Sequence, residues 1–466
     1  MLPIINYLRH YKFETMKGIF LAFSLAIFFA VGCGNNEQVI SADQIVAEAN
    51  SGTGYELLRE LTKEIGPRLS GSENAAKAVQ WGIETFEKLG FDTFYLQEVM
   101  VPHWERGEAE EAFMLNTGAS IEVTALGGSV GTDGLLEAEV IQVKSFKELE
   151  DLGRKNIEGK VVFYNRPMDG KLRNTFRAYG MAVNQRADGA WQAAQYGAKA
   201  VLVRSMTTAK DLNPHTGTMN YVDSIAKIPA FAIATADAEK LAAAMEKETQ
   251  KVSLKSNCQW FPDALSHNVI GEIWGSSDSI IAIGGHLDSW DLGEGAHDDG
   301  AGIVHSIEAV RILKALGYKP KNTLRVVMFM NEENGAMGGK MYAEQADRLG
   351  EKHLAAIESD RGGFEAEAFS VDGDSSQIDL IKSLLPQLSK TDIKEVYQGY
   401  AGVDISFLRE YNPNLCMIGL VPNPEKYFNY HHTKADVLES VDPKELASGS
   451  AALANLIYLI DSRGKL

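Results

Sequence analysis

The sequence predicts an α/β protein in which a mostly parallel sheet lies between helices and is interrupted by a second, smaller α/β module. Two observations support this fold class. From about residue 265 onward, short apolar strands alternate with amphipathic helices, which is typical of parallel strands joined by helical crossovers. Residues 120–255 show the same alternation in shorter segments and carry no catalytic cluster of their own.

The N-terminal segment resembles an export signal. Lys17 precedes the apolar run 18–32, which ends in small residues before Cys33. A run of 15 residues is short for a membrane span but suits a signal peptide. The small residues before Cys33 resemble a bacterial lipoprotein signal, in which the cysteine becomes the lipidated first residue; the alternative is an ordinary signal peptide with an incidental cysteine. We therefore expect residues 1–33 to direct export to the periplasm or cell surface, with Cys33 as the only membrane anchor.

Residues 34–118 are expected to form the first part of the main domain. Apolar residues at 57, 58, 61 and 65 share one helical face, and the glycine-containing stretch 66–72 ends that helix. A second helix is expected over 75–89, followed by a strand over 91–101.

Residues 119–258 are expected to form the inserted module. Short buried strands are indicated at 159–165, 198–204 and 227–235, with a helical segment at 182–197 between the first two. Because the module holds no catalytic cluster, its expected role is to cover or recognise the substrate.

Residues 259–466 are expected to form the rest of the main domain. Strands are predicted at 280–283, 324–330, 354–357 and 415–421, and helices at 301–316 and 444–460. The first of these helices carries one apolar stripe, and Gly317 suits its C-terminal end. Ligands of such sheets bind at the carboxyl ends of the strands.

Composition excludes several classes of protein. With 45% hydrophobic and 23% charged residues, the chain is globular rather than disordered or fibrous. The net charge of −18 and the lack of a basic cluster argue against a nucleic-acid partner. Beyond Cys33 only Cys258 and Cys416 remain, too few for a disulfide framework, and whether these two pair is open.

Acidic residues and histidines follow each predicted strand of the last segment. They are His286 and Asp288 after the first strand, Glu332 and Glu333 after the second, Asp360 after the third, and His431, His432 and Asp436 after the fourth. One such cluster alone would be read as a solvated turn. Four such clusters at one edge of the sheet would raise the pKa values of one another's carboxylates unless cations neutralised them. Imidazole with carboxylate suits zinc, and a shared carboxylate permits two ions about 3.5–4 Å apart.

The motifs also resemble a known family. HxD at 286–288, DDG at 298–300, the Glu-Glu pair, ESD at 358–360 and HHTxxD at 431–436 are similar to those of the co-catalytic zinc exopeptidases. GPRLSGS, PHWERGE, PHTG and YFNYHH resemble the carboxypeptidase Q branch, over nearly all of the chain after the signal. The resemblance implies that the module at 119–258 is a protease-associated insert, and that the protein is a homodimer.

The resemblance also implies a ligand set for two zinc ions per chain. His286 and Asp360 would bind one zinc, Glu333 and His432 would bind the other, and Asp298 would bridge the two. Asp299 adjoins the bridge and is expected to support the loop or cap the next helix.

The resemblance also implies roles for four further residues. Asp288 would orient the imidazole of His286, and Glu332 would be the general base. His431 takes a position where some relatives have a tyrosine that stabilises the tetrahedral intermediate; it either donates to the oxyanion or simply packs. Adjacent residues of an extended segment point to opposite sides, so we expect only His432 to reach the metal. Asp404 is expected in the substrate pocket, where many relatives have Ser-Asp-His.

The expected function is therefore hydrolysis of short peptides, most readily dipeptides with free termini. An aminopeptidase acting on longer peptides is the nearest alternative, and a glutaminyl-cyclase-like acyl transfer is a more distant one. A non-catalytic receptor or scaffold on the same fold should have lost its metal ligands, whereas here all five ligand positions and Glu332 are chemically competent.

Overall fold

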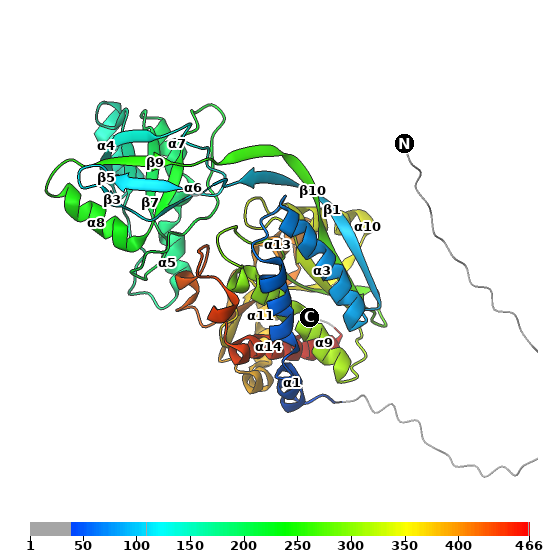
Figure 1. Cartoon of the computed structure of the whole chain (residues 1–466). Helices are drawn as coiled ribbons and strands as arrows, with labels where there is room; N and C mark the ends of the chain where they lie inside the picture. Colours follow the sequence, from blue (N-terminus) through cyan, green and yellow to red (C-terminus); the bar gives the residue numbers. More distant parts are fainter. Residues whose placement is uncertain (1–38, 109, 465) are drawn as a thin grey trace, which may run out of the picture. The chain divides into compact units, whose positions relative to one another are not determined.

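The computed structural model describes residues 39–108, 110–464 and 466 (Figure 1). The predicted signal segment with Cys33 lies outside these residues, so its lipidation stays a prediction. In the part of the chain that is described, no helix has the length and apolar character needed to cross a membrane. Cys258 and Cys416 are both buried as free thiols, so the pairing left open by the sequence does not form.

An eight-stranded sheet forms the centre of the main domain. In spatial order its strands are β1 (Thr93–Glu105), β10 (Gln259–Ile273), β12 (Thr323–Phe329), β11 (Ser279–His286), β13 (Lys352–Glu358), β16 (Cys416–Pro422), β14 (Ala366–Asp372) and β15 (Glu395–Gln398). The neighbours β12, β11, β13 and β16 are parallel, whereas β1 with β10, β10 with β12, and β14 with β16 are antiparallel. The predicted parallel sheet is thus confirmed for the centre, and antiparallel strands flank it.

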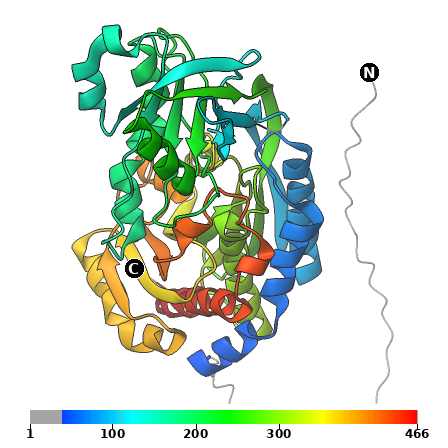
Figure 2. The same ribbon diagram turned by 60° about the vertical axis from the view of Figure 1, so that its left-hand side comes forward.

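Helices cover both faces of this sheet. The longer ones are α1 (Ala42–Ala49), α2 (Thr53–Arg59), α3 (Glu73–Leu89), α9 (Ala301–Ala315), α10 (Met337–Leu349), α11 (Ser375–Ser383) and α14 (Pro443–Arg463), and the short ones include α12 (Leu385–Leu388) and α13 (Val403–Ser406). Successive side chains of a strand point to opposite faces. Val326 and Met328 therefore pack with α3, α9 and α14, while Val327 and Phe329 pack with α10 and α13. On one face the first and last of these helices pack together, and Figure 2 shows α1 (blue) beside α14 (red).

Helix α9 is buried more completely than its sequence indicates. The sequence predicts one apolar stripe, and the structure also buries polar residues outside it such as Ser306 and Glu308. Helices α1, α2 and α14 cover the outer side of α9, which explains the difference. Glu308 is stabilised there by an ion pair with Arg311 at 2.5 Å.

The inserted module is built on a second eight-stranded sheet. Its strands, in spatial order, are β3 (Ala119–Ser120), β2 (Glu111–Met114), β9 (Lys251–Lys255), β5 (Leu136–Val143), β6 (Val161–Tyr164), β7 (Ala200–Arg204), β8 (Ala230–Ile233) and β4 (Val123–Ala125). Its helices are α4 (Phe146–Ile157), α5 (Thr175–Ala182), α6 (Asn184–Ala187), α7 (Gly189–Ala194) and α8 (Thr235–Met245). Strand β2 belongs to this sheet although it precedes residue 119, the boundary expected from the sequence.

The module and the main domain share part of one apolar core. The ring of Phe176 on α5 lies 5.0 Å from the ring of Tyr427 and 5.0 Å from that of Phe428. Both partners belong to the loop that follows β16, and they join the core cluster of the insert. Packing on this loop fixes the module beside the histidines at 431 and 432.

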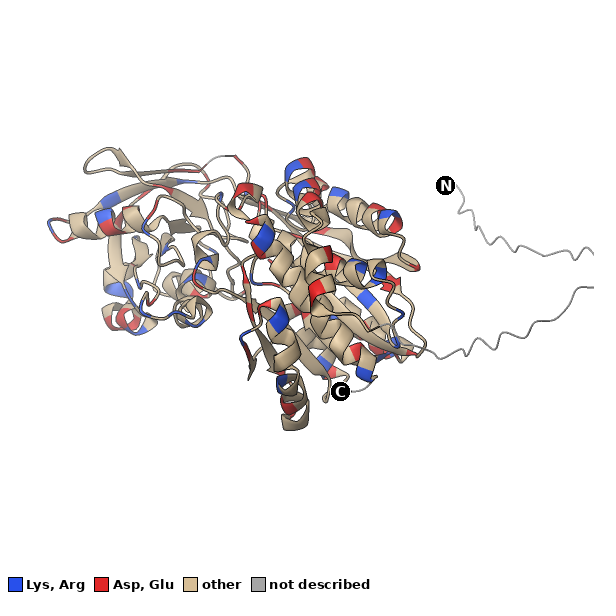
Figure 3. Cartoon of the chain, turned by 90° about the horizontal axis from the view of Figure 1, so that it is seen from below, with Lys and Arg blue, Asp and Glu red and all other residues tan. Residues whose placement is uncertain are grey.

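Charged residues of both signs are interspersed on the helices seen in Figure 3. On α4, for example, Lys147 pairs with Asp151 at 2.7 Å and Arg154 pairs with Glu158 at 3.1 Å. Such exposed pairs add little to stability, and a surface of mixed sign does not attract polyanions strongly.

Candidate metal centre and catalytic cavity

Four parallel strands end at the edge of the sheet where the predicted site residues lie. Strand β11 ends at His286 itself, and β13 ends at Glu358, two residues before Asp360. Strand β12 leads directly into the turn with Glu332 and Glu333, and the loop after β16 brings in the two histidines. Because these strands are neighbours and parallel, their carboxyl ends meet, which is the juxtaposition that the sequence predicted.

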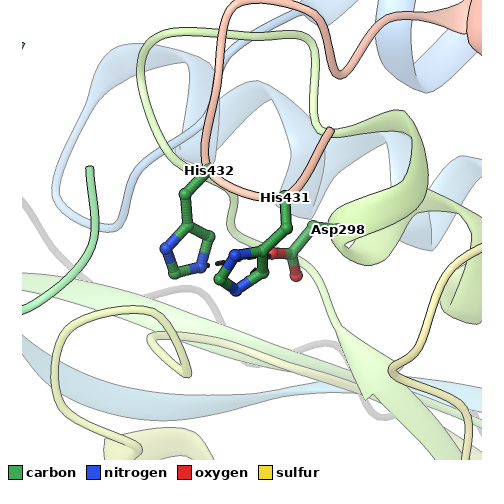
Figure 4. Close-up of side chains that lie close together, drawn as sticks. All are labelled: Asp298, His431 and His432. Atoms are coloured by element: carbon green, nitrogen blue, oxygen red, sulfur yellow. Dashed lines mark ion pairs between the residues drawn. The ribbon is translucent and has the colours of Figure 1, made fainter. Parts of the chain in front are cut away.

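Asp298 lies at the centre of this group. Its Oδ1 atom is 3.2 Å from Nε2 of His286, and its Oδ2 atom is 3.2 Å from Nε2 of His432. In Figure 4 a dashed line joins the imidazole of His432 to the carboxylate of Asp298 behind the ring of His431. One buried carboxylate therefore presents one oxygen to each of two histidines, which is the arrangement needed to bridge two cations.

Each of the two histidines has a second carboxylate close by. Oδ1 of Asp360 lies 3.6 Å from Nε2 of His286, and Oε2 of Glu333 lies 3.1 Å from Nε2 of His432. The structure thus brings the five predicted ligands together and sorts them into two halves that share Asp298.

The electrostatics of the group fit a cationic ligand. Oδ2 of Asp298 and Oε1 of Glu333 are buried and accept no hydrogen bond from the described residues. Burial raises the pKa of Glu333 to about 7 and also raises the pKa of Asp360. Buried carboxylates without donors are costly unless a cation neutralises them. The donor set of two imidazoles and three carboxylates is that of zinc rather than of an oxygen-only metal.

Backbone carbonyls select the tautomer of both histidines. Nδ1 of His286 lies 2.9 Å from the carbonyl oxygen of Asp288, and Nδ1 of His432 lies 3.3 Å from that of Thr216. A carbonyl oxygen only accepts, so both Nδ1 atoms carry the proton and both Nε2 atoms offer a lone pair to a metal. Thr216 belongs to the PHTG motif of the insert, whose sequence gave no sign of this contact.

The side chain of Asp288 has a different task from the predicted one. Its carboxylate is 3.7 Å from Nδ1 of His286, too far for a hydrogen bond. It instead accepts the backbone N–H groups of Asn331 at 2.7 Å, Glu332 at 3.1 Å and Glu333 at 3.4 Å. Asp288 therefore orients His286 through its main chain and holds the turn with the two glutamates through its side chain.

Two further aspartates support the loop that carries Asp298. Asp436 accepts the N–H groups of His297 at 2.7 Å and Asp298 at 3.1 Å. Asp299 accepts the N–H groups of His286 at 3.0 Å and Gly302 at 3.1 Å. The contacts of Asp299 agree with the supporting role expected for it.

Arg68 is a site residue that the sequence analysis missed. It is completely buried and donates to the carbonyl oxygens of Leu287 at 2.6 Å, Glu294 at 2.7 Å and Gly295 at 3.0 Å. Burial lowers its pKa to about 10. The motif GPRLSGS, which contains Arg68, is the only local sequence signal of this role, because these three hydrogen-bond partners of Arg68 lie more than 200 positions away in the chain.

The two adjacent histidines do not point to opposite sides, as the sequence led us to expect. Their rings stack with centroids 3.4 Å apart and 20° between planes, and both face Asp298 (Figure 4). The prediction was wrong because the segment is not extended: φ of His432 is +62°. Nε2 of His431 is 3.8 Å from Oδ2 of Asp298, and its buried Nδ1 has no partner among the described residues.

A cavity of about 540 Å³ opens over these residues. Asp298, Glu332, Glu333, Asp360, His431 and His432 line it from the main domain, and Asn174, Phe176, Arg177, Tyr179, Arg186 and Thr218 line it from the insert. Asp404, the residue expected in the pocket, is completely buried and does not line the cavity, whereas its neighbours Gly402 and Val403 do. It belongs to the short helix α13, and neither of its carboxylate oxygens has a hydrogen-bond partner among the described residues.

Comparisons with known proteins place this geometry in context. Residues 268–457 match the model of peptidase family M28. Carboxypeptidase Q of Bos taurus is 35% identical over 413 residues, which cover 87% of this chain and 84% of the relative. The crystal structure of a peptidase M28 precursor from Shewanella amazonensis is 33% identical, with a TM-score of 0.86 over 90% of this chain and 96% of that one. A zinc aminopeptidase from Bacillus subtilis shares the fold at 21% identity, with a TM-score of 0.63 over 90% and 95% of the two chains.

Replacing Asp298 by alanine should weaken zinc binding by more than the roughly 10–100-fold that loss of an outer partner costs, because both histidines lose their shared carboxylate. Zinc per chain, measured by mass spectrometry after dialysis against a buffered zinc concentration, should fall below that of the unmodified protein. Asp374→Ala, at an exposed helix cap, is the matched control and should leave zinc content unchanged. Undiminished zinc affinity in Asp298→Ala would contradict a ligand role.

Proposed function

The chain belongs to peptidase family M28 and is a zinc metallopeptidase, and on this premise we propose that it is a dizinc exopeptidase that hydrolyses short peptides, chiefly dipeptides with free termini. The observation that carries the proposal is the carboxylate of Asp298 between two oriented histidines, beside a cavity that the insert walls on one side. The homodimer expected from the sequence stays a prediction.

The ligands divide naturally between two zinc ions. His286 and Asp360 would hold one ion, Glu333 and His432 the other, and Asp298 would be shared, as their proximity supports. When bound, zinc supplies Lewis-acid polarisation of the substrate carbonyl and of water. The rest of the chemistry falls to the side chains around it.

We assign the proton transfer to Glu332. It lines the cavity, and the contact of its N–H with Asp288 fixes its backbone. Burial, reinforced by the nearby charges of Asp360 and Glu333, raises its pKa well above the ordinary value, so the carboxylate is a stronger base than a free glutamate. It takes the proton of the attacking water and returns it to the leaving amine.

His431 is placed to donate to the oxyanion. It lines the cavity and stacks on His432, which fixes the orientation of its ring. Burial lowers its pKa well below the ordinary value, so the imidazole is neutral and carries one N–H. That N–H donates to the oxygen that becomes negative when water adds to the peptide carbonyl.

Substrate length is the direct test of the proposed specificity. A library of unblocked dipeptides should be cleaved faster than the same dipeptides with blocked termini and faster than peptides of four or more residues, because the insert closes one side of the cavity. The measurement is kcat/KM for each by chromatographic detection of released amino acids. Rapid stepwise removal of residues from the N-terminus of long peptides would instead identify an aminopeptidase.

Glu332→Gln and Glu333→Gln should fail in different ways. Glu332→Gln keeps the size of the side chain but cannot accept a proton, so turnover should fall by about 10²–10⁴-fold with zinc content unchanged. Glu333→Gln should weaken zinc binding, and added zinc should restore part of its activity. Equal zinc loss in both variants would contradict this division, and each variant serves as the control for the other.

His431→Ala should lower turnover by about 10²–10³-fold, the range for one oxyanion donor, while zinc content and KM stay close to normal. His431→Gln keeps an N–H donor and should recover part of the loss. His432→Ala should lose zinc. Unchanged turnover in His431→Ala would show that this ring only packs, and zinc loss in that variant would make it a ligand.

A further inference from the structure

The insert contributes a buried arginine to the catalytic cavity. Arg186 lies on α6, is only 5% exposed, and lines the same cavity as Asp298 and Glu332. Neither the ligand set nor the proton transfer described above uses this side chain.

No carboxylate is among the groups that Arg186 contacts. Its Nη2 donates to the hydroxyl of Tyr179 at 2.7 Å, and its Nη1 lies 3.4 Å from the carbonyl oxygen of Thr216 and 3.5 Å from Nδ1 of His432. Its Nε is buried without a partner, and none of the ion pairs among the described residues involves it. A buried guanidinium with no anion is costly, so the protein retains a group that lacks its natural partner.

The acidic residues around the cavity have other tasks. Asp298, Glu333 and Asp360 belong to the ligand group, and Glu332 is the base. The remaining one, Glu358, accepts the N–H groups of Val403 at 2.8 Å and Ile405 at 3.0 Å. The anion that suits Arg186 must therefore come with the substrate.

The position of Arg186 fits one particular anion. Its guanidinium passes beside His432 because residue 217 is glycine: a Cβ there would lie 2.3 Å from Nη1 of Arg186 and 2.6 Å from Nδ1 of His432. Arg186 thus contacts the far edge of a proposed zinc ligand. In a dipeptide the carboxylate carbon is only about 2.5 Å from the nitrogen of the scissile bond, so the carboxylate also stays close to the metal centre.

We infer that Arg186 binds the free α-carboxylate of the peptide substrate. A guanidinium offers two parallel N–H donors to a carboxylate, and Tyr179 holds one edge of the group in place. In a longer peptide, a neutral backbone amide instead of the α-carboxylate would lie next to the guanidinium of Arg186. The inference rests on the proposed exopeptidase function and names the residue that would set its preference for dipeptides.

Another arginine of the cavity provides a matched control. Arg361 is half-buried and donates to Oγ of Ser370 at 3.2 Å and to the carbonyl oxygen of Tyr400 at 2.8 Å. It lines the same cavity, lies over the ring of Phe176, and makes no hydrogen bond with His432.

The experiment compares leucyl-glycine with its C-terminal amide in the zinc-loaded protein. The unmodified enzyme should prefer the free acid. Arg186→Met should lower kcat/KM for the acid by about 30-fold or more, with little change for the amide. This factor is the lower end of the range for the loss of affinity when one partner is removed from a buried charge pair. Arg186→Lys should be intermediate because it keeps the charge without the paired donors. Arg361→Met should keep the preference for the acid.

Binding gives a second readout that does not need turnover. Calorimetric affinity of leucyl-glycine for the Glu332→Gln variant should fall by a similar factor when Arg186→Met is added, with zinc content and melting temperature unchanged. Any of three results would overturn the inference. The first is an acid-to-amide ratio of kcat/KM that stays the same in Arg186→Met, and the second is loss of that ratio in Arg361→Met instead. The third is an equal decrease of kcat/KM for both substrates in Arg186→Met, accompanied by zinc loss. Failure of the unmodified enzyme to cleave either dipeptide would reject the proposed function, while the binding comparison would still decide the role of Arg186.

Discussion

The need to neutralise buried carboxylates is the constraint on which the rest of this structure depends. Asp298, Glu333 and Asp360 meet two imidazoles at one edge of the sheet, and two of their oxygens have no hydrogen-bond donor among the described residues. Burying such a group is costly unless a cation neutralises it. Four parallel strands are needed to assemble it, because each delivers part of the donor set to the same edge.

Much of the remaining architecture keeps these donors in place. The carboxylates of Asp288, Asp299 and Asp436 each accept backbone N–H groups from loops of the site, and the buried Arg68 binds three backbone carbonyls of another stretch. Charged side chains thus hold the backbone of these irregular loops in place, as the hydrogen bonds between neighbouring strands hold the backbone of a sheet. The loops can then be both irregular and rigid, as catalytic geometry requires.

The sequence was sufficient for the strand ends and for the donors that follow them, because parallel strands joined by helices have few possible arrangements. It failed where the outcome depends on one backbone angle or on a distant partner. The positive φ of His432 turned two neighbouring rings to the same side, and Asp404 is buried without lining the cavity. Arg68 and Thr216 act on partners more than 200 positions away, and no local pattern encodes such contacts.

The antiparallel ribbon of β1 and β10 makes it easy to insert or replace a module at this point of the chain during evolution. Glu105 and Gln259 face each other in that ribbon, so the chain leaves the main domain and returns to it at nearly the same point. Opposite residues of such a ribbon lie about 4.5–5.5 Å apart, so a segment spliced between them needs little extra loop entropy to close. The module can thus be exchanged as a single unit without breaking the main sheet, but a new module must itself supply a carbonyl for Nδ1 of His432 in place of that of Thr216.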